Sequence, residues 1–134
     1  MDELRLDTSI ENLDKLVSVL DEQLEAANCP MKAQLQLDVA VEEIFGNIAS
    51  YAYDGEKGLV IVQLNISGEV AEIIFVDEGK PFNPLEVDEP NVEEIAQSEK
   101  LGGLGIFMVK ESMDQVHYDY RDGKNFLTIK KFLN

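Results

Sequence analysis

The sequence is poor in cysteine and histidine. It contains one cysteine, Cys29, and one histidine, His117, which lie far apart along the chain. A single cysteine excludes an intrachain disulfide, so a reducing compartment fits the sequence. The distant histidine also makes Cys29 a poor candidate for a nucleophile. We therefore expect Cys29 to be a structural residue and the chain to be cytoplasmic.

Basic residues are scarce as well. The chain has 11 Lys and Arg against 27 Asp and Glu, a formal net charge of −16 at pH 7, and no basic cluster offsets it locally. Such a surface would repel a nucleic-acid backbone, so we expect no nucleic-acid partner. An acidic surface is compatible with a basic protein partner and equally with simple solubility.

Long apolar runs are missing, and so are the basic and apolar segments of a secretory signal at residues 1–6. No stretch approaches the ~18 apolar residues that a membrane span requires, so we expect no membrane partner. The length of 134 residues, with 45% hydrophobic composition, suits one core. We expect a single domain over residues 1–134.

The spacing of apolar residues divides the chain into elements. In chain order they are a strand over 3–7, helices over 8–28 and 31–53, a hairpin of strands 59–65 and 70–77, a helix over 102–115, and a hairpin of strands 116–121 and 125–132. Thr8 and Glu11 are expected to form a capping box at the start of the first helix. Residues 78–101 hold three prolines and no sustained period, which indicates a long functional loop. The order predicts an α+β fold, a two-layer sandwich of a mixed, mostly antiparallel sheet with helices on one face.

One strip of the second helix carries polar side chains that could act together. Glu43 and Asn47 are four residues apart, and Tyr51 follows one turn later. A carboxylate and an amide oxygen so placed could address a magnesium-bound phosphate and its attacking group. The same pair also occurs on many solvated helix faces. Glu42 is as far from the centre of the apolar stripe as Glu43, but only Glu43 has Asn47 one turn on.

Asp77 directly follows the apolar strand 70–76, and Gly79 lets the chain turn two residues later. A carboxylate at a strand end can accept a hydrogen bond from an adenine amino group. An acidic turn after a strand is the alternative interpretation.

Glycines at positions 102, 103 and 105 open the third helix. They leave backbone N–H groups free to approach an anion, and the positive end of the helix dipole favours it. This pattern suits a polyphosphate, although a glycine-rich helix start can also be a hinge.

Together, and in this order, the three features resemble the motifs of the GHKL ATPases, the group that contains gyrase B subunits and sensor histidine kinases. Residues 43–53 resemble the N box of that group, residues 77–84 its first glycine box, and residues 102–107 its second. The resemblance extends from the first helix to the final hairpin and implies the Bergerat-type ATP-binding fold. The Ala-Tyr that ends the N box and the Pro-Phe-Asn-Pro of the first glycine box are most similar to the anti-sigma-factor serine kinases.

The resemblance implies ATP and Mg²⁺ as cofactors and a role for each matching residue. Glu43 would be the general base, Asn47 the magnesium ligand and Asp77 the adenine anchor. The residues implied to contact the nucleotide are Asn47, Asp77, Gly79, Gly103, Leu104, Gly105 and Thr128. Gly79 would let the adenine lie close to the backbone, and the second glycine box would cradle the phosphates. Thr128 matches a threonine near the adenine, and a core strand threonine is an equally good interpretation.

The implied function is an ATP-dependent protein serine/threonine kinase of anti-sigma-factor type. Its partner would be an anti-sigma-factor antagonist domain, with a sigma factor as the alternative, and related kinases often form homodimers. A different use of the same site is a binding module in which ATP orders the loop over 78–101 and so switches a protein interface. A third, less favoured hypothesis is a self-contained ATPase or a detached histidine-kinase catalytic domain.

Two positions depart from the family pattern. Lys100 and Leu101 stand where some anti-sigma kinases carry an arginine, and Tyr51 stands where His or Lys is common. Few cations are then available to neutralise a γ-phosphate. We expect nucleotide binding to depend strongly on Mg²⁺ and on the helix N-terminus.

Overall fold

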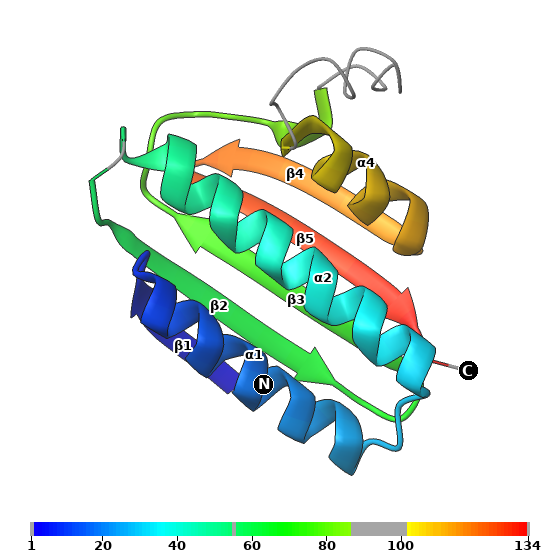
Figure 1. The fold of residues 1–134 in the computed structure, drawn as a ribbon. Coiled ribbons are helices and arrows are strands. Elements are labelled where there is room, and N and C mark those ends of the chain that lie inside the picture. Colours follow the sequence, from blue (N-terminus) through cyan, green and yellow to red (C-terminus); the bar gives the residue numbers. More distant parts are fainter. Residues whose placement is uncertain (1, 55, 87–101, 134) are drawn as a thin grey trace.

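A five-stranded sheet is the centre of the fold in the computed structural model, which describes residues 2–54, 56–86 and 102–133 (Figure 1). Its strands are β1 (Asp2–Asp7), β2 (Leu59–Ile66), β3 (Val70–Asp77), β4 (Gln115–Arg121) and β5 (Lys124–Phe132). The order across the sheet is β1-β2-β3-β5-β4, and each neighbouring pair is antiparallel. The predicted α+β class is confirmed, and the sheet of the described residues is antiparallel throughout rather than mixed.

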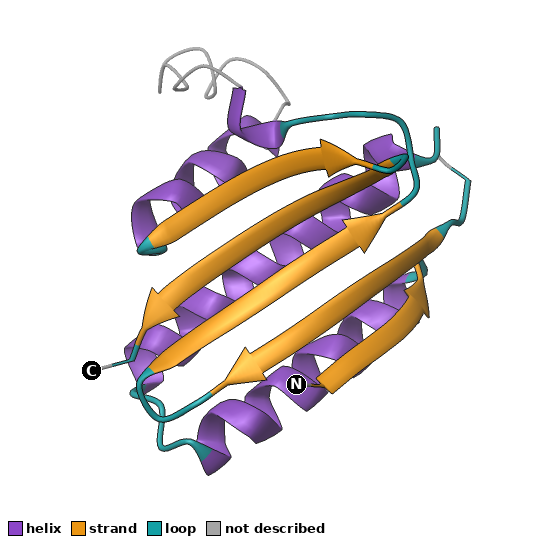
Figure 2. Ribbon diagram, turned by 180° about the vertical axis from the view of Figure 1, so that it is seen from behind, coloured by secondary structure: helices purple, strands orange, loops and turns teal. Residues whose placement is uncertain are grey.

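The helices α1 (Ile10–Ala26), α2 (Met31–Asn47) and α4 (Gly102–Ser112) cover one face of the sheet. Figure 2 shows that no helix of the described residues lies on the opposite face. α2 continues into a π-helical turn, η1 (Ile48–Ala52), and a 3₁₀ turn, η2 (Pro84–Glu86), follows β3. Within the described ranges, no helix has the length and apolar character that crossing a membrane requires.

The core lies between the helices and the covered face of the sheet. Its largest fully buried side chains come from α1, α2 and alternate positions of the central strands: Leu16, Leu20, Leu24, Leu37, Val41, Ile44, Phe45, Val60, Leu64, Ile73, Phe75 and Ile129. The helical residues recur every three to four positions and the strand residues every second position, which is how each element presents one face to the core. Each such side chain stabilises the fold by roughly 1.5–3 kcal/mol on burial.

The start of α1 differs from the sequence prediction. Its N-cap is Ser9, without a side-chain capping bond, so the capping box of Thr8 and Glu11 is wrong. Asp7 Oδ1 instead accepts hydrogen bonds from Ser9 N (2.9 Å) and Asn12 Nδ2 (2.8 Å), while Thr8 Oγ1 accepts one from Gly58 N (3.2 Å). Asp7 therefore ties the end of β1 to the first turn of α1, and Thr8 contacts the segment before β2.

Both predicted hairpins are confirmed. In the turn between β4 and β5, Asp122 and Gly123 have φ values of 54° and 74°, the left-handed pair that a two-residue hairpin turn requires. α4 ends at Ser112, earlier than expected. Of the predicted loop over 78–101, residues 87–101, and with them Lys100 and Leu101, lie outside the described residues.

Candidate functional site

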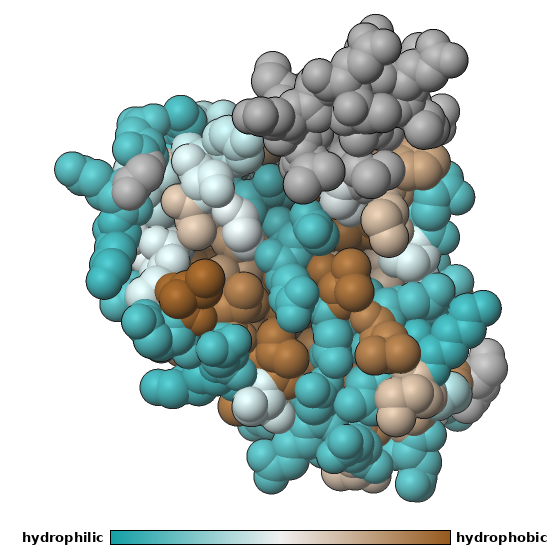
Figure 3. Space-filling model, in the orientation of Figure 1, coloured by the Kyte–Doolittle hydropathy of each residue, from teal (hydrophilic) through white to brown (hydrophobic). Residues whose placement is uncertain are grey.

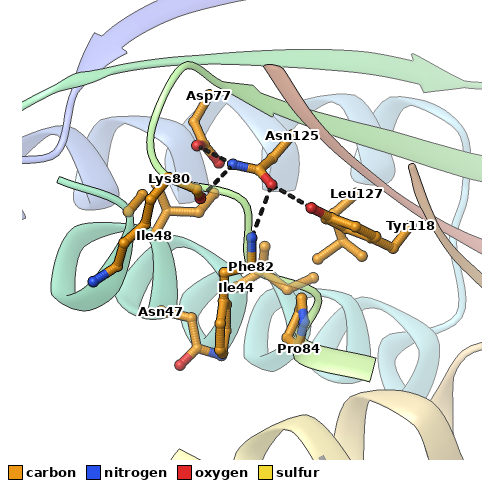
Figure 4. Close-up of a pocket in the computed structure, with 11 residues that line it drawn as sticks. Ile44, Asn47, Ile48, Asp77, Lys80, Phe82, Pro84, Tyr118, Asn125 and Leu127 are labelled. Atoms are coloured by element: carbon orange, nitrogen blue, oxygen red, sulfur yellow. Dashed lines mark hydrogen bonds between the residues drawn. The ribbon is translucent and has the colours of Figure 1, made fainter. Parts of the chain in front are cut away.

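A pocket opens between the end of α2, η1, the segment after β3 and the strands β4 and β5 (Figure 4). Its lining residues are Ile44, Asn47, Ile48, Ala52, Asp77, Lys80, Phe82, Pro84, Tyr118, Asn125 and Leu127. Most of these side chains are apolar, while Asp77 and Asn125 face each other at one end. Apolar walls with a few convergent polar groups are typical of a site for a small organic ligand, such as a flat ring.

Asp77 is the last residue of β3 and is only 6% exposed. Its Oδ1 accepts hydrogen bonds from Gly79 N and from Asn125 Nδ2, each at 2.9 Å. Burial raises the pKa of the Asp77 carboxyl, and the two hydrogen bonds partly oppose that rise. Neither of these two hydrogen bonds uses Oδ2, so this oxygen can accept a hydrogen bond from a ligand.

Asn125 is the site residue that the sequence prediction missed. It lies directly opposite Asp77 in the β3–β5 register and is 5% exposed. Its Nδ2 also donates to Lys80 O (3.0 Å) and, more weakly, to Gly79 O (3.4 Å). Its Oδ1 accepts from Phe82 N (3.2 Å) and from the Tyr118 hydroxyl.

A signal for Asn125 was present in the sequence. Leu127 and Ile129 alternate with it along β5 and are buried against the helices. Asn125 is thus a buried polar residue on the core face of this strand. A buried polar group needs hydrogen-bond partners, and such a position points to a site.

The structure does not bring Thr128 to the pocket. Thr128 pairs with Ile74 on one side and with His117 on the other. Since successive side chains of a strand point to opposite faces, Thr128 lies on the open face of the sheet, opposite to Leu127. The expected β5 contribution to the site is corrected from Thr128 to Asn125.

Gly79 permits a close approach of two backbone segments. A Cβ at this position would lie 2.3 Å from Ala52 O, and the next residue, Lys80, donates its N–H to the same oxygen at 3.0 Å. The Tyr53 hydroxyl supports the same segment by accepting from Glu78 N (2.9 Å) and donating to Leu59 O. The chain after Asp77 is therefore attached to η1, one wall of the pocket.

Asn47 and Glu43 lie one turn apart on α2, as expected. Asn47 lines the pocket, and its Nδ2 is buried without a hydrogen-bond partner among the described residues. Glu43 is partly buried, and a Cβ at Gly105 would meet its Oε2 at 1.9 Å, so the carboxylate packs against the first turns of α4. Glu42 is exposed.

The remaining predicted residues lie around these two. Tyr51 is exposed, and its ring centroid is 5.7 Å from that of Phe82, which lines the pocket. Gly103 and Leu104 belong to the first turn of α4, and the structure does not describe their side chains. Asn47 and Asp77 thus share the pocket, and the Glu43–Gly105 contact lies one helical turn from Asn47.

The oxygen atoms at the pocket suit a metal ion that binds together with a phosphate-containing ligand. Mg²⁺ binds oxygen atoms and usually takes one or two from the protein and the rest from phosphates and water. Asn47 supplies an amide oxygen at the pocket, and its buried amide still needs a partner. The described residues contain no group of three His, Cys, Asp or Glu that could hold an ion alone.

Comparison with known proteins identifies the family of this chain. A family model for the histidine kinase-like ATPase domain matches residues 6–131. The serine-protein kinase RsbW of Listeria innocua is 30% identical over 103 residues, which are 73% of this chain and 65% of the relative. RsbW of Bacillus licheniformis is 30% identical over 104 residues, 73% of this chain and 64% of the relative. The chain thus spans a little under two thirds of the length of these relatives.

Two solved structures share the fold. The crystal structure of the RsbU and RsbW domains of a Mycobacterium tuberculosis protein has a TM-score of 0.64 and 16% identity, over 98% of this chain and 33% of that one. The Acinetobacter baumannii histidine kinase AdeS has a TM-score of 0.53 and 13% identity, over 100% of this chain and 68% of that one. At these identities the likeness concerns the fold alone. Because the family model covers nearly the whole chain, the protein belongs to the histidine kinase-like ATPase family.

Proposed function

We propose that this protein binds Mg²⁺-ATP and transfers its γ-phosphate to a serine or threonine of an anti-sigma-factor antagonist domain. The observation that carries the proposal is the pocket that Asn47 and Asp77 line together, with Glu43 one turn from Asn47 and packed against α4. The relatives named serine-protein kinase RsbW support the choice of kinase. A sigma factor is the alternative partner, and a cytoplasmic homodimer remains a prediction.

The adenine ring would occupy the end of the pocket near Asp77. Its amino group would donate to Asp77 Oδ2, and Ile48 and Leu127 offer apolar surface to the ring. A hydrogen bond to a charged group contributes about 1.5–3 kcal/mol, which is enough to select one base over another. Gly79 would matter here by keeping the segment after Asp77 in place beside Ala52.

The phosphates would extend from Asn47 toward the N-terminus of α4, where Gly103, Leu104 and Gly105 would provide backbone N–H groups. Asn47 Oδ1 would hold the magnesium ion. When bound, that ion would neutralise charge on the phosphate oxygens. Lys80 is the one cation among the lining residues, and its Nζ pairs with Asp54 at 2.7 Å. Among the residues that the structure describes, little positive charge is therefore available at this pocket.

Glu43 would act as the general base. It would take the proton of the attacking hydroxyl while the oxygen bonds to the γ-phosphorus and the bond to the ADP oxygen breaks, which leaves a phosphorylated side chain and ADP. Positioning and charge neutralisation supply most of the rate enhancement in such transfers. The packing of Glu43 against Gly105 supports a fixed position for its carboxylate.

The second candidate function is a switch that binds ATP without transferring phosphate. The shortage of cations at the pocket favours it, because a developing charge on the γ-phosphate would have few partners. Nucleotide binding would then act only by ordering the chain around the site.

Glu43→Gln separates the two functions. We expect its affinity for Mg²⁺-ATP, measured by calorimetry, to stay within a few-fold of the wild type. Single-turnover transfer from γ-labelled ATP to an antagonist-domain protein should fall by ~10²–10⁴-fold. The control is Glu42→Gln, at the exposed neighbouring position, which should keep both properties.

Three other results would change the assignment. A wild type that binds ATP and transfers nothing would favour the switch. Loss of transfer in Glu42→Gln alone would make Glu42 the base. A wild type that binds no nucleotide would overturn the proposal as a whole.

A further inference from the structure

The orientation of the Asn125 side-chain amide is determined by backbone groups that can only donate or only accept. Gly79 O and Lys80 O are acceptors, so the atom near them must be the Nδ2 donor. Phe82 N is a donor, so the atom near it must be Oδ1. If the amide were turned over, Oδ1 would face the two carbonyl oxygens and Nδ2 would face the N–H of Phe82. Asn125 is only 5% exposed, so water could not replace the lost hydrogen bonds.

A fixed amide in turn determines what Asp77 can do. Asn125 Nδ2 and Gly79 N both donate to Asp77 Oδ1, and two donors on one oxygen favour the ionised carboxylate. Burial acts in the opposite direction and raises the pKa of Asp77. Without the donors, this carboxyl would hold its proton more readily and could then donate a hydrogen bond itself. With them, Oδ2 is an acceptor.

We propose that Asn125 is the specificity-determining residue that makes this end of the pocket accept an N–H donor, and so selects a purine with an exocyclic amino group at position 6. The inference rests on the proposed nucleotide site and adds to it the residue that sets its hydrogen-bonding polarity. Adenine presents an amino group at position 6 beside an unprotonated N1, whereas hypoxanthine presents a carbonyl at position 6 beside an N1–H, and the rest of the ring is the same. The carbonyl oxygen would face the oxygen of Asp77 and lose the bond.

The same amide connects the base-binding end to the chain that follows β3. Asn125 contacts Asp77 and three backbone groups between Gly79 and Phe82, the latter on the pocket wall. Figure 4 shows the bonds to Asp77, Lys80 and Phe82 converging on this one side chain. A replacement that removes the Nδ2 donor would alter both the charge state of Asp77 and the position of this wall.

The experiment compares Mg²⁺-ATP with Mg²⁺-ITP by calorimetry, in the wild type and in Asn125→Asp. The wild type should bind ATP about 10- to 100-fold more tightly than ITP, the range expected for one hydrogen bond to a charged group. Asn125→Asp keeps the shape but replaces the donor by an acceptor beside Asp77. We expect the ATP to ITP ratio to fall by about tenfold, because ATP loses affinity and ITP loses much less.

Two further variants complete the test. Asn65→Asp makes the same change at an exposed position of β2 and should keep the wild-type ratio. Asn125→Ser, which retains a hydroxyl able to donate to Asp77, should have a ratio between those of the wild type and Asn125→Asp. If circular dichroism shows that Asn125→Asp does not fold, Asn125→Ser takes its place in the comparison of ATP with ITP.

The outcomes are distinct. An equal loss of ATP and ITP affinity in the Asn125 variants would mean a structural role only and overturn the inference. A wild-type ratio near one would overturn it while leaving nucleotide binding intact. Failure of the wild type to bind either nucleotide would refute the proposed function itself, and this inference with it.

Discussion

Gly105 and Glu43 are packed so closely that a Cβ at position 105 would lie 1.9 Å from Oε2 and 2.4 Å from Cδ of the glutamate. The contact joins the middle of α2 to the first turns of α4. The side chain proposed as general base is therefore held by a backbone segment that sequence analysis assigned to phosphate binding.

Gly105→Ala should displace the Glu43 carboxylate and leave the fold intact. The obstructing atoms are at the end of a flexible side chain, and alanine is a better helix former by up to ~1 kcal/mol, so thermal unfolding should change little. A displacement of the base by about 1 Å can lower the rate by ~10²-fold, which single-turnover phosphotransfer would detect. Gly46→Ala is the control, because a Cβ there meets nothing within 4 Å. Equal activity of the two variants would contradict the proposed role of the contact.

Gly79→Ala should destabilise the protein where Gly68→Ala does not. At position 79 the new Cβ would lie 2.3 Å from the backbone oxygen of Ala52, which cannot move aside as a side chain can. Overpacking of this kind costs about 1–3 kcal/mol. At position 68 there is nothing within 4 Å, so the change should stay within about 0.5 kcal/mol. Denaturant unfolding would measure both, and ATP affinity should fall only in Gly79→Ala.

Thr128→Val tests the reassignment on β5. Because Thr128 lies on the open face of the sheet, removing its hydroxyl should leave the affinity for Mg²⁺-ATP within about twofold of the wild type. Calorimetric titration is the measurement. A large loss of affinity would return Thr128 to the site and would mean that the register of β5 differs from the one described.

Asp38 should make stability depend on pH. Asp38 on α2 and Asp21 on α1 interact across the helix interface, and Oδ1 of each is buried without a partner among the described residues. Burial, the contact with Asp21 and the charges of Asp21 and Glu42 raise the pKa of Asp38 to about 7. The folded protein then holds a proton that the unfolded chain releases near pH 4.

The sign follows from this difference. The folded state binds more protons between about pH 4 and pH 7, so stability falls as the pH rises through that window. Asp38→Asn should remove the effect and be more stable than the wild type at pH 8, by about 1–2 kcal/mol once solvent screening of the half-buried pair is included. The gain should vanish near pH 4. Denaturant unfolding at both pH values is the measurement, with Asp14→Asn at an exposed position of α1 as control. A gain of equal size at both pH values would contradict the shared proton.

Most of the secondary structure could be predicted from the local sequence. The period of the apolar residues predicted the helices and the hairpins, since that period is what buries one face of each element. It failed at the start of α1, where Ser9 is the N-cap and Thr8 makes no capping bond. Thr8 Oγ1 instead accepts a hydrogen bond from Gly58 N, next to the β1–β2 pairing, and no local pattern contains that contact.

The site residues also fall into two groups, those that the sequence could identify and those that only the strand register identifies. Glu43, Asn47 and Asp77 were found because each stands in a short motif whose residues are close in sequence. Asn125 matters because it donates a hydrogen bond to Asp77, and only the β3–β5 register brings the two residues together. Thr128 was chosen because it resembles a threonine of the family pattern, and only the register shows that it lies on the open face of the sheet.

The sequence by itself determined the elements, the fold class and the residues that could bind a nucleotide, since periodicity and motif chemistry are local properties of the chain. Only the tertiary structure decided which of those residues share a pocket and which strand residue completes it. It also decided that Glu43 meets Gly105 and that Asp38 meets Asp21. These contacts arise from strand register and helix packing, which depend on how all the elements bury their apolar faces together and not on any one segment.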